Sequence, residues 1–555
     1  MWLVPRSIAY YVRVTDNSKW NFADLWEVIA DQLPGATALV HGDRRYTWSQ
    51  MDRRADGLAA TLVGSGLTYQ SKVAQYLYNR PEYMESVFGT LKAGMVPVNT
   101  NYRYMKDELI YLWDNADTEA VVFEGSFAEG IEPIRSKLPN VKIWLFVDDG
   151  SGPCPEWATP YEEAVTSARE GRFTAPWERT GDDLYLLYTG GTTGYPKGVM
   201  WRQDDLFMRV LGGLSLAPFS LTGGMDGVRR ALKGPGISLL PACPLMHGTG
   251  AFTALGIMSM AGSIVTLTKR SFDAAELLET VTREKINALS IVGDAFAKPI
   301  VAELEAHPDR YTIASVVSII SSGVMWSEQT KEALLDRNPN MLLVDVFSSS
   351  EAVGMGMSIS SGVTAANTGK FTLGEGVRVL DPDTLEEVAP GSDTSGIVAL
   401  PGRNPIGYYK DERKTAATFR LIGGVSYVIP GDFATIGADG TIHLLGRGSE
   451  CINTGGEKVF PEEVEEVIKA HDGVRDAVVV GIPDDKFGEA ITAVVELQSA
   501  SQVTAHELID HVKANLAGYK APKRVRFVDT IGRAPNGKVD YARHRQEAIA
   551  WAAAL

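Results

Sequence analysis

Residues 189 to 198 read TGGTTGYPKG and lie between the apolar runs LYLLY and VMW. Glycine lets backbone N–H groups approach an anion closely, and threonine hydroxyls add further hydrogen-bond donors. Lys197 adds a positive charge. The composition therefore predicts a loop that wraps the phosphates of a nucleoside triphosphate.

This segment differs from the P-loop of NTPases, in which G-x-x-x-x-G-K is followed by Ser or Thr and opens a helix. Lys197 follows Pro196 rather than glycine, and it leads into the β-prone run VMW. The pair Gly537-Lys538 is followed by Val539. A triphosphate must therefore be bound by another arrangement.

Four further polar segments could contribute to such a site. FSSSE, residues 347 to 351, directly follows the apolar run LLVDV, so its hydroxyls and carboxylate suit a phosphate oxygen and Mg²⁺. PGDFATIGADGTIHLLGR contains Asp432 and Arg447, whose side chains can hold ribose oxygens. NTGGEKVFPEEVE, residues 453 to 465, is a glycine-containing loop that runs into a helix, and RAPNGKVD carries Lys538. Each segment alone is also typical of an ordinary polar turn.

In this order, the five segments resemble the adenylate-forming superfamily, which contains acyl-CoA synthetases, firefly-type luciferases and peptide-synthetase adenylation domains. The resemblance covers nearly the whole chain. YTGGTTGYPKGV is similar to the family's phosphate loop, FSSSE to its aromatic-Gly-x-Thr-Glu segment, and GDFATIGADG to its ribose aspartate segment. GRGSECINTGGEKVFP is similar to its hinge and following loop, and RAPNGK to its C-terminal lysine loop.

The resemblance implies an ATP site that these segments assemble. Glu351 would help to hold Mg²⁺, Phe347 would stack on adenine, and Asp432 and Arg447 would hold the ribose. Ser350 stands where the family usually has Thr. The implied nucleotide-binding residues are Thr189, Gly190, Gly191, Thr192, Thr193, Gly194, Lys197, Ser322, Gly323, Val324, Asp345, Val346, Phe347, Ser348, Ser350, Asp432, Arg447 and Lys538.

Catalytic roles follow from the same resemblance. Carboxylate attack on the α-phosphate joins two anions, so positive charge must be focused where negative charge builds up, and Lys538 is similar to the family's lysine for this step. A hinge at Ser449, where Asp or Lys is common, would then turn the C-terminal domain for reaction with a thiol. The implied catalytic residues are Lys538, Glu351, Thr189 and His247, the acyl-pocket residues are His247, Phe252, Val324 and Met325, and the coenzyme A channel residues are Gly455, Gly456 and Glu457.

We therefore predict an ATP- and Mg²⁺-dependent acyl-CoA synthetase, with coenzyme A as co-substrate and an apolar carboxylic acid as substrate. The segment from residue 201 to residue 236 resembles that of actinobacterial synthetases for steroid side chains or other bulky acids, but an aromatic or medium-chain acid fits as well. Three alternatives remain open. The enzyme could load a carrier protein, the chain could be a non-catalytic nucleotide-binding regulator, and a luciferase-like oxygenase shares the adenylation half of the chemistry.

Alternating apolar runs and amphipathic stretches must position these segments, and this alternation predicts an α/β fold. Two α/β lobes are expected at about 1–180 and 181–370, and a small β-barrel at 371–447. In the second lobe the predicted strands are 264–268, 288–292, 315–320 and 342–346, and the predicted helices lie near 273–284 and 327–336. Residues 448–555 form a mobile α+β domain in this interpretation, so that 1–447 is the nucleotide-binding part.

Composition narrows the class of protein further. The 555 residues carry a net charge of −16, which argues against nonspecific binding to nucleic acid or anionic lipid. The three cysteines give no disulfide framework, and the N-terminus lacks a signal-peptide core, so we predict a cytoplasmic protein. Residues 234–268 lack charged side chains, but Pro and Gly interrupt them, so no membrane span is expected. The protein could assemble as a homodimer.

Overall fold

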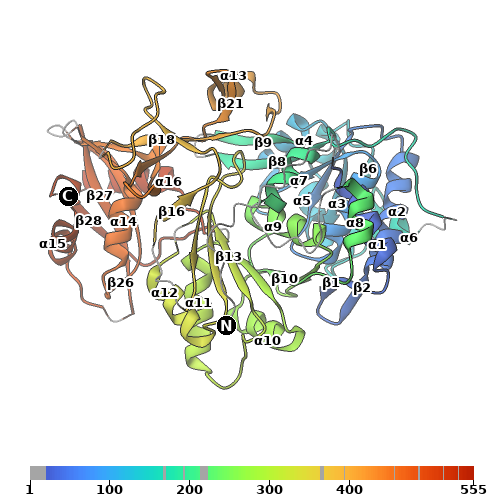
Figure 1. Ribbon diagram of the computed structural model, residues 1–555, viewed down its shortest axis with the longest axis horizontal. Coiled ribbons are helices and arrows are strands. Elements are labelled where there is room, and N and C mark those ends of the chain that lie inside the picture. The colour runs from blue at the N-terminus through green and yellow to red at the C-terminus, as the bar shows by residue number, and fades with distance from the viewer. Residues whose placement is uncertain are drawn as a thin grey trace.

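Three β-sheets organise the described part of the chain (Figure 1). The structure is a computed structural model that describes residues 20–166, 171–191, 194–212, 223–324, 326–362, 368–392, 394–454, 457–484, 488–499, 501–516, 518–534 and 537–554. Two large sheets form the N-terminal part, and a smaller one forms the C-terminal part. The mixed α/β fold class predicted from the sequence is confirmed.

The first sheet has the strand order β19-β9-β8-β4-β3-β5-β6-β7. Its strands are β3 (Lys72–Tyr76), β4 (Val96–Asn99), β5 (Thr118–Glu124), β6 (Ile143–Val147), β7 (Thr159–Pro160), β8 (Leu184–Gly191), β9 (Gly194–Arg202) and β19 (Gly407–Tyr408). The central strands are parallel and largely buried, as expected for a sheet that helices cover on both faces. β8 and β9 form an antiparallel hairpin, and β19 adds to its edge.

The second sheet has an antiparallel pair, β2-β1, at one edge, parallel strands from β1 to β14, and then the antiparallel strands of the predicted barrel. The order is β2-β1-β11-β10-β12-β13-β14-β15-β16-β23-β22-β18-β21-β20, and β17 pairs with β18. Its strands are β1 (Thr37–His41), β2 (Arg44–Thr47), β10 (Ser238–Pro241), β11 (Ser263–Thr266), β12 (Ala288–Ile291), β13 (Ser318–Ser322), β14 (Leu342–Phe347), β15 (Gly356–Ser360), β16 (Lys370–Leu373), β17 (Arg378–Leu380), β18 (Gly396–Pro401), β20 (Phe419–Ile422), β21 (Val425–Val428), β22 (Asp432–Ile436) and β23 (Thr441–Arg447).

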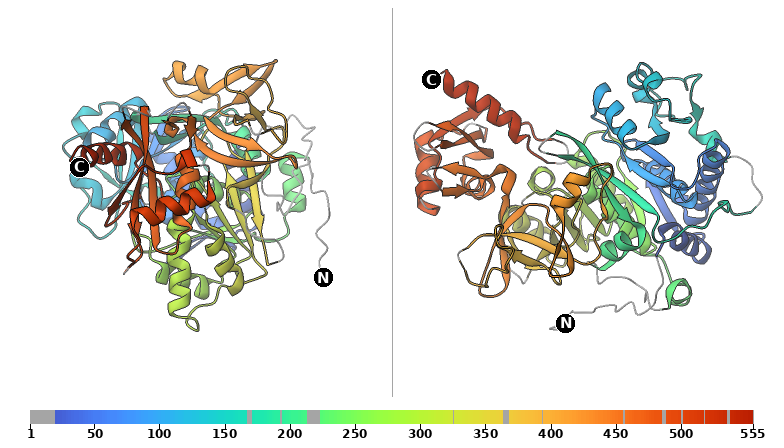
Figure 2. Two further views of the ribbon diagram at one scale, coloured as in Figure 1. Left: turned by 90° about the vertical axis from the view of Figure 1, so that its left-hand side faces the viewer. Right: turned by 90° about the horizontal axis from the view of Figure 1, so that it is seen from above.

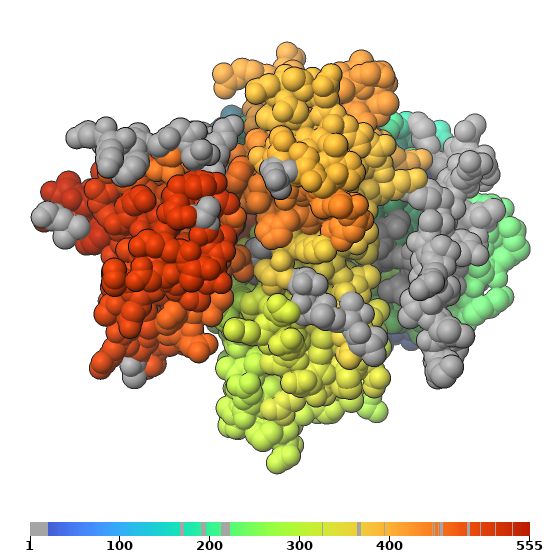
Figure 3. Space-filling view, turned by 60° about the vertical axis from the view of Figure 1, so that its left-hand side comes forward, coloured from blue at the N-terminus to red at the C-terminus, as the bar shows by residue number. Residues whose placement is uncertain are grey.

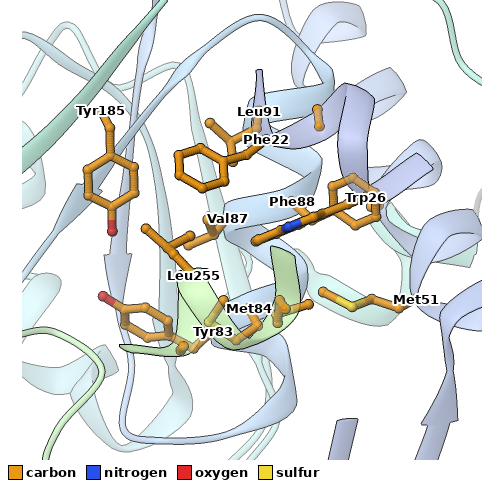
Figure 4. Packing of buried hydrophobic residues seen from close by; sticks show 14 of the residues in the cluster. Phe22, Trp26, Met51, Tyr83, Met84, Val87, Phe88, Leu91, Tyr185 and Leu255 are labelled. Carbon is orange, nitrogen blue, oxygen red and sulfur yellow. The ribbon is translucent and has the colours of Figure 1, made fainter. Parts of the chain in front are cut away.

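Helices cover the faces of these sheets. They are α1 (Phe22–Gln32), α2 (Trp48–Gly64), α3 (Pro81–Lys92), α4 (Lys106–Asn115), α5 (Ala128–Ile131), α6 (Tyr161–Thr166), α7 (Gln203–Gly212), α8 (Gly224–Ala231), α9 (Gly248–Ser259), α10 (Ala274–Glu284), α11 (Asp294–Ala306), α12 (Glu328–Arg337) and α13 (Glu412–Thr418). A capping box between Thr47 and Gln50 starts α2, and Pro81 occupies the first turn of α3. Figure 4 shows α1, α2, α3 and α9 sharing one core, in which Trp26, Phe88 and Leu255 are almost fully buried.

The third sheet contains β24 (Ile452–Thr454), β25 (Glu457–Val459), β26 (Val474–Asp484), β27 (Gly488–Leu497) and β28 (Arg524–Val528). Helices α14 (Pro461–Lys469) and α15 (Ala505–Asn515) share one apolar cluster with the sheet, and α16 (Tyr541–Ala553) shares another. The C-terminal unit lies beside the barrel strands and away from β3 to β6 (Figure 2). In Figure 3 the surface of the C-terminal unit borders that of the barrel strands. Contact is made by α14 with β23 and by the rings of Phe433 and Phe460, 5.4 Å apart.

Two details differ from the expectations. β13 begins three residues later than the predicted strand, because Val316 donates a backbone hydrogen bond to Ile313 in a turn. The two α/β lobes also exchange strands across residue 180: β1 and β2 join the second sheet, whereas β8 and β9 join the first. The charge-free segment 234–268 folds as β10, α9 and β11, and no helix among the described residues is long and apolar enough to cross a membrane.

Candidate active site

The predicted phosphate loop is the β8–β9 hairpin. Thr189 pairs with Lys197 across it, and Gly191 pairs with Gly194, so its described part is extended strand rather than the loop expected from composition. Thr192 and Thr193 lie outside the described residues. The Lys197 amino nitrogen is 3.9 Å from an Asp411 carboxylate oxygen. The hairpin therefore presents Lys197 at one end of the first sheet.

The FSSSE segment follows β14 and approaches the hairpin. The Trp201 indole on β9 donates a hydrogen bond to the backbone carbonyl of Ser350, 2.9 Å away. Ser348 accepts a hydrogen bond from the amide of Gly354, which shapes the turn. The partly exposed carboxylate of Glu351 accepts a hydrogen bond from the Tyr408 hydroxyl at 2.8 Å. The Lys197 amino nitrogen lies 5.9 Å from the centroid of the Tyr408 ring, so Tyr408 neighbours both Glu351 and Lys197.

The residues predicted around adenine lie at the ends of neighbouring parallel strands. Ser322 on β13 pairs with Val346 on β14, and Gly323 follows with a φ of +96°. That backbone conformation favours glycine. Val324 packs on the second sheet's core, and Met325 lies outside the described residues. The strand ends therefore bring this group together at one edge of the sheet.

Two of these side chains already have protein partners. Asp345 is buried, and its carboxylate oxygen is 3.2 Å from the amino nitrogen of Lys331. Burial raises the pKa of Asp345 to about 6, although the Lys331 charge opposes that rise. The ring of Phe347 lies 5.7 Å from that of Phe371 in the barrel core. Stacking of Phe347 on adenine remains a prediction.

The residues expected to hold the ribose face each other on two barrel strands. Asp432 on β22 is the direct partner of Arg447 on β23, and Asp432 is buried. The side chains of Arg447 and Ser449 lie outside the described residues. Gly455 and Gly456 are also outside them, as is the side chain of Glu457, so their channel role remains a prediction.

His247 occupies the N-cap position of α9. Although part of the residue is exposed, the surrounding protein desolvates the imidazole, and together with the charges of Lys538 and Arg103 it lowers the pKa of His247 to about 3. Phe252, one turn further along α9, packs edge-on against Trp201 with ring centroids 6.2 Å apart. A neutral imidazole and an aromatic wall therefore lie next to the FSSSE segment.

The Lys538 loop reaches this site from the C-terminal unit. Gly537 has a φ of +74°, and a side chain there would lie 3.2 Å from Val292 and 3.3 Å from Ala295 of the N-terminal part. Arg533 holds the loop by donating to the Gly537 carbonyl at 3.1 Å. The Lys538 charge also contributes to the lowered pKa of His247. The structure thus brings the Lys538 loop against Val292 and Ala295 of the N-terminal part.

The motif reasoning missed Asn99 and Tyr408. The Asn99 amide donates to the carbonyls of Tyr188 and Met246, and its oxygen accepts from the Tyr188 amide, so it joins the phosphate hairpin to the segment before α9. A polar residue at the end of the buried strand β4 was the available signal. Tyr408 had no comparable signal in the sequence.

The side chains near the hairpin fit Mg²⁺ that is bound together with a triphosphate. No group of three His, Cys, Asp or Glu side chains suited to a metal ion occurs within the described ranges. Mg²⁺ is usually held by one or two carboxylates plus substrate phosphates rather than by an all-protein cage. A single carboxylate at Glu351, beside the phosphate hairpin, matches that mode of binding.

Comparison with known proteins identifies the family of this chain. The family model "AMP-binding enzyme" matches residues 26–409, and "AMP-binding enzyme C-terminal domain" matches residues 463–538. A medium/long-chain-fatty-acid–CoA/3-oxocholest-4-en-26-oate–CoA ligase of Mycobacterium marinum is 40% identical over 94% of this chain and 95% of its own. A 3-oxocholest-4-en-26-oate–CoA ligase of Rhodococcus rhodochrous is 38% identical over 94% of each chain.

The solved structures agree as well. ATP-bound MatB from Rhodopseudomonas palustris superposes with a TM-score of 0.79 at 26% identity, covering 95% of this chain and 99% of that one. Because a single family model spans residues 26–409 and the relatives match nearly from end to end, this chain belongs to the AMP-binding enzyme family.

Proposed function

We propose that this chain is an ATP- and Mg²⁺-dependent acyl-CoA synthetase that acts on an apolar carboxylic acid, either a fatty acid or a bulky steroid side-chain acid. The observation that carries the proposal is the approach of the Lys538 loop to Val292 and Ala295 of the N-terminal part. The names and nearly full-length similarity of the mycobacterial and rhodococcal ligases support the substrate class.

In the first half-reaction, a carboxylate oxygen of the acid attacks the α-phosphorus of ATP, and the bond to the β-phosphate oxygen breaks. Acyl-AMP forms and pyrophosphate leaves. Lys538 stabilises the charge that builds up between the two anions. His247 is neutral at pH 7, so it closes the acyl side of the site without adding a competing positive charge.

Other residues hold the nucleotide in this proposal. The β8–β9 hairpin and Lys197 bind the β- and γ-phosphates, and Asp432 and Arg447 bind the ribose. Glu351 supplies the protein ligand for Mg²⁺, which neutralises phosphate charge when bound.

In the second half-reaction, the thiol of coenzyme A attacks the acyl carbonyl, loses its proton, and displaces AMP. The C-terminal domain, proposed as 448–555, turns about Ser449, so that Gly455, Gly456 and Glu457 line the thiol channel. The N-terminal domain, 1–447, keeps the nucleotide. The short helix Gly448–Glu450 lies between β23 of the second sheet and β24 of the third sheet, which supports this location of the hinge.

The decisive experiment incubates the purified protein with ATP, Mg²⁺ and a panel of steroid side-chain, aromatic and fatty acids, and measures AMP release with and without coenzyme A. We expect release that depends on coenzyme A with fatty or steroid-derived acids. Acid-dependent ATP–pyrophosphate exchange without any effect of coenzyme A would favour carrier-protein loading instead.

The proposal also includes a cytoplasmic location, which cell fractionation tests, and a homodimer, which light scattering tests.

A further inference from the structure

Tyr408 neighbours the two charged side chains Glu351 and Lys197, although none of the five segments predicted from the sequence includes it. Its hydroxyl donates a hydrogen bond to Glu351 at 2.8 Å. The Lys197 amino nitrogen lies 5.9 Å from the centroid of its ring. Tyr408 is only 5% exposed, so the ring has little freedom to move. One buried side chain therefore lies next to both the predicted metal ligand and the phosphate-loop cation.

Backbone pairing fixes Tyr408 to the strand that carries Lys197. In β19, Tyr408 pairs with Val199 of β9, and Gly407 pairs with Met200. The Tyr408 amide donates to the Thr415 hydroxyl at 2.9 Å, which ties β19 to α13. Relative motion of Glu351 and the hairpin would therefore break the hydrogen bond from the Tyr408 hydroxyl.

The loop before β19 is anchored independently. Arg209 on α7 donates to the carbonyls of Pro401 and Arg403, at 2.6 and 2.7 Å. Asn404 donates to the carbonyl of Leu400 at 2.8 Å. Both ends of β19 are thus held, and Tyr408 can act as a fixed donor rather than as a side chain that follows Glu351.

We propose that Tyr408 is a positioning residue that holds the Glu351 carboxylate in the orientation needed to bind Mg²⁺ beside the phosphate hairpin. The inference rests on the proposed function, because it takes Glu351 as the metal ligand. A hydrogen bond to a ligating carboxylate fixes its orientation, and loss of such a partner typically weakens metal binding by about 10- to 100-fold. The ring, by contrast, is left in place next to Lys197 when only the hydroxyl is removed.

The next residue offers a matched control. The Tyr409 hydroxyl donates to an Asp117 carboxylate oxygen, also at 2.8 Å, and its own backbone amide donates to Gly198. Tyr408→Phe and Tyr409→Phe therefore each remove one hydroxyl–carboxylate hydrogen bond from adjacent positions. Only the first of these bonds reaches Glu351.

The test titrates Mn²⁺, as a paramagnetic substitute for Mg²⁺, into protein that holds a non-hydrolysable ATP analogue, and follows free Mn²⁺ by electron paramagnetic resonance. Tyr408→Phe should raise the Kd for Mn²⁺ about ten-fold or more, and Tyr409→Phe should leave it unchanged. In the Glu351→Gln background, Tyr408→Phe should cause no further loss.

An unchanged Kd in Tyr408→Phe would overturn the proposal, and so would an equal loss in Tyr409→Phe. An additive loss in the Glu351→Gln background would also overturn it, because Tyr408 would then act through the general fold. The binding readout needs no acid and no turnover. Failure of every acid in the panel would therefore count against the proposed function alone, while the Mn²⁺ titration still decides the role of Tyr408.

Discussion

Asn99 joins two parts of the candidate site that are far apart in the sequence. Its side-chain nitrogen donates to the Tyr188 carbonyl at 2.8 Å and to the Met246 carbonyl at 2.7 Å. Its side-chain oxygen accepts from the Tyr188 amide at 2.6 Å. Tyr188 directly precedes Thr189, and Met246 directly precedes His247. One buried side chain thus fixes the phosphate hairpin against the start of α9.

Asn99→Ala removes all three hydrogen bonds and leaves their backbone partners buried. At roughly 1 kcal/mol for each bond, the free energy of unfolding of the N-terminal part should fall by about 3 kcal/mol. A displacement of the hairpin by about 1 Å relative to the acid should lower acid-dependent ATP–pyrophosphate exchange by up to about 100-fold. Urea unfolding measures the first effect, and exchange well below the unfolding temperature measures the second.

Asn79→Ala is the matched control. Asn79 also makes three hydrogen bonds, to the carbonyls of Pro241 and Cys243 and from the amide of Leu245. Because none of these reaches β8, its loss should destabilise the protein to a similar degree and lower exchange much less. Equal losses of exchange in the two alanine variants would refute the claim that Asn99 acts by positioning the hairpin.

Three further perturbations test the proposed roles. Lys538→Ala should lower ATP–pyrophosphate exchange by about 100-fold or more yet spare thioester formation from supplied acyl-AMP, and near-normal exchange would contradict its role. Ser449→Pro should impair one half-reaction selectively, whereas equal loss in both would argue against a hinge there. The pKa of His247 is lowered from 6.5 to about 3, so between these pH values the unfolded state binds a proton that the folded state does not. His247→Gln should therefore lose less free energy of unfolding than the unsubstituted protein as the pH falls from 6.5 toward 3. An unchanged dependence of the free energy of unfolding on pH would contradict the lowered pKa.

The sequence predicted many individual strands and helices because apolar runs and helix caps are local signals. The runs LLVDV and ALSIV correspond to the partly buried strand β14 and the buried strand β12, and Asp273 caps the helix predicted near 273–284. Which sheet a strand joins depends on packing between distant segments. β1 and β2 are followed by α2 and β3 in the chain, yet β1 pairs with β11. No periodicity within 37–47 carries that information.

The two residues missed at the site have the same explanation. Asn99 reaches Met246 across 147 positions, and Tyr408 reaches Glu351 across 57 positions. An asparagine at the end of a strand and a tyrosine in a short strand are ordinary residues at such places. Their roles arise only when the first sheet, α9 and β19 meet, so they follow from tertiary packing and not from a motif.

Residue types explain why the sequence predicts the phosphate-binding end of the site but not the end that binds the acid. A phosphate site uses glycine backbone together with hydroxyl and lysine side chains, and these polar side chains are rare in an apolar core because unpaired buried polar groups are costly. An apolar acid requires only apolar walls, and those use the residues of the core itself. Met258 is fully buried and Phe252 is 9% exposed, and both belong to the large core cluster of the N-terminal part. Specificity for the acid therefore depends on the shape that α9 and its neighbours leave open, which is a property of packing rather than of residue type.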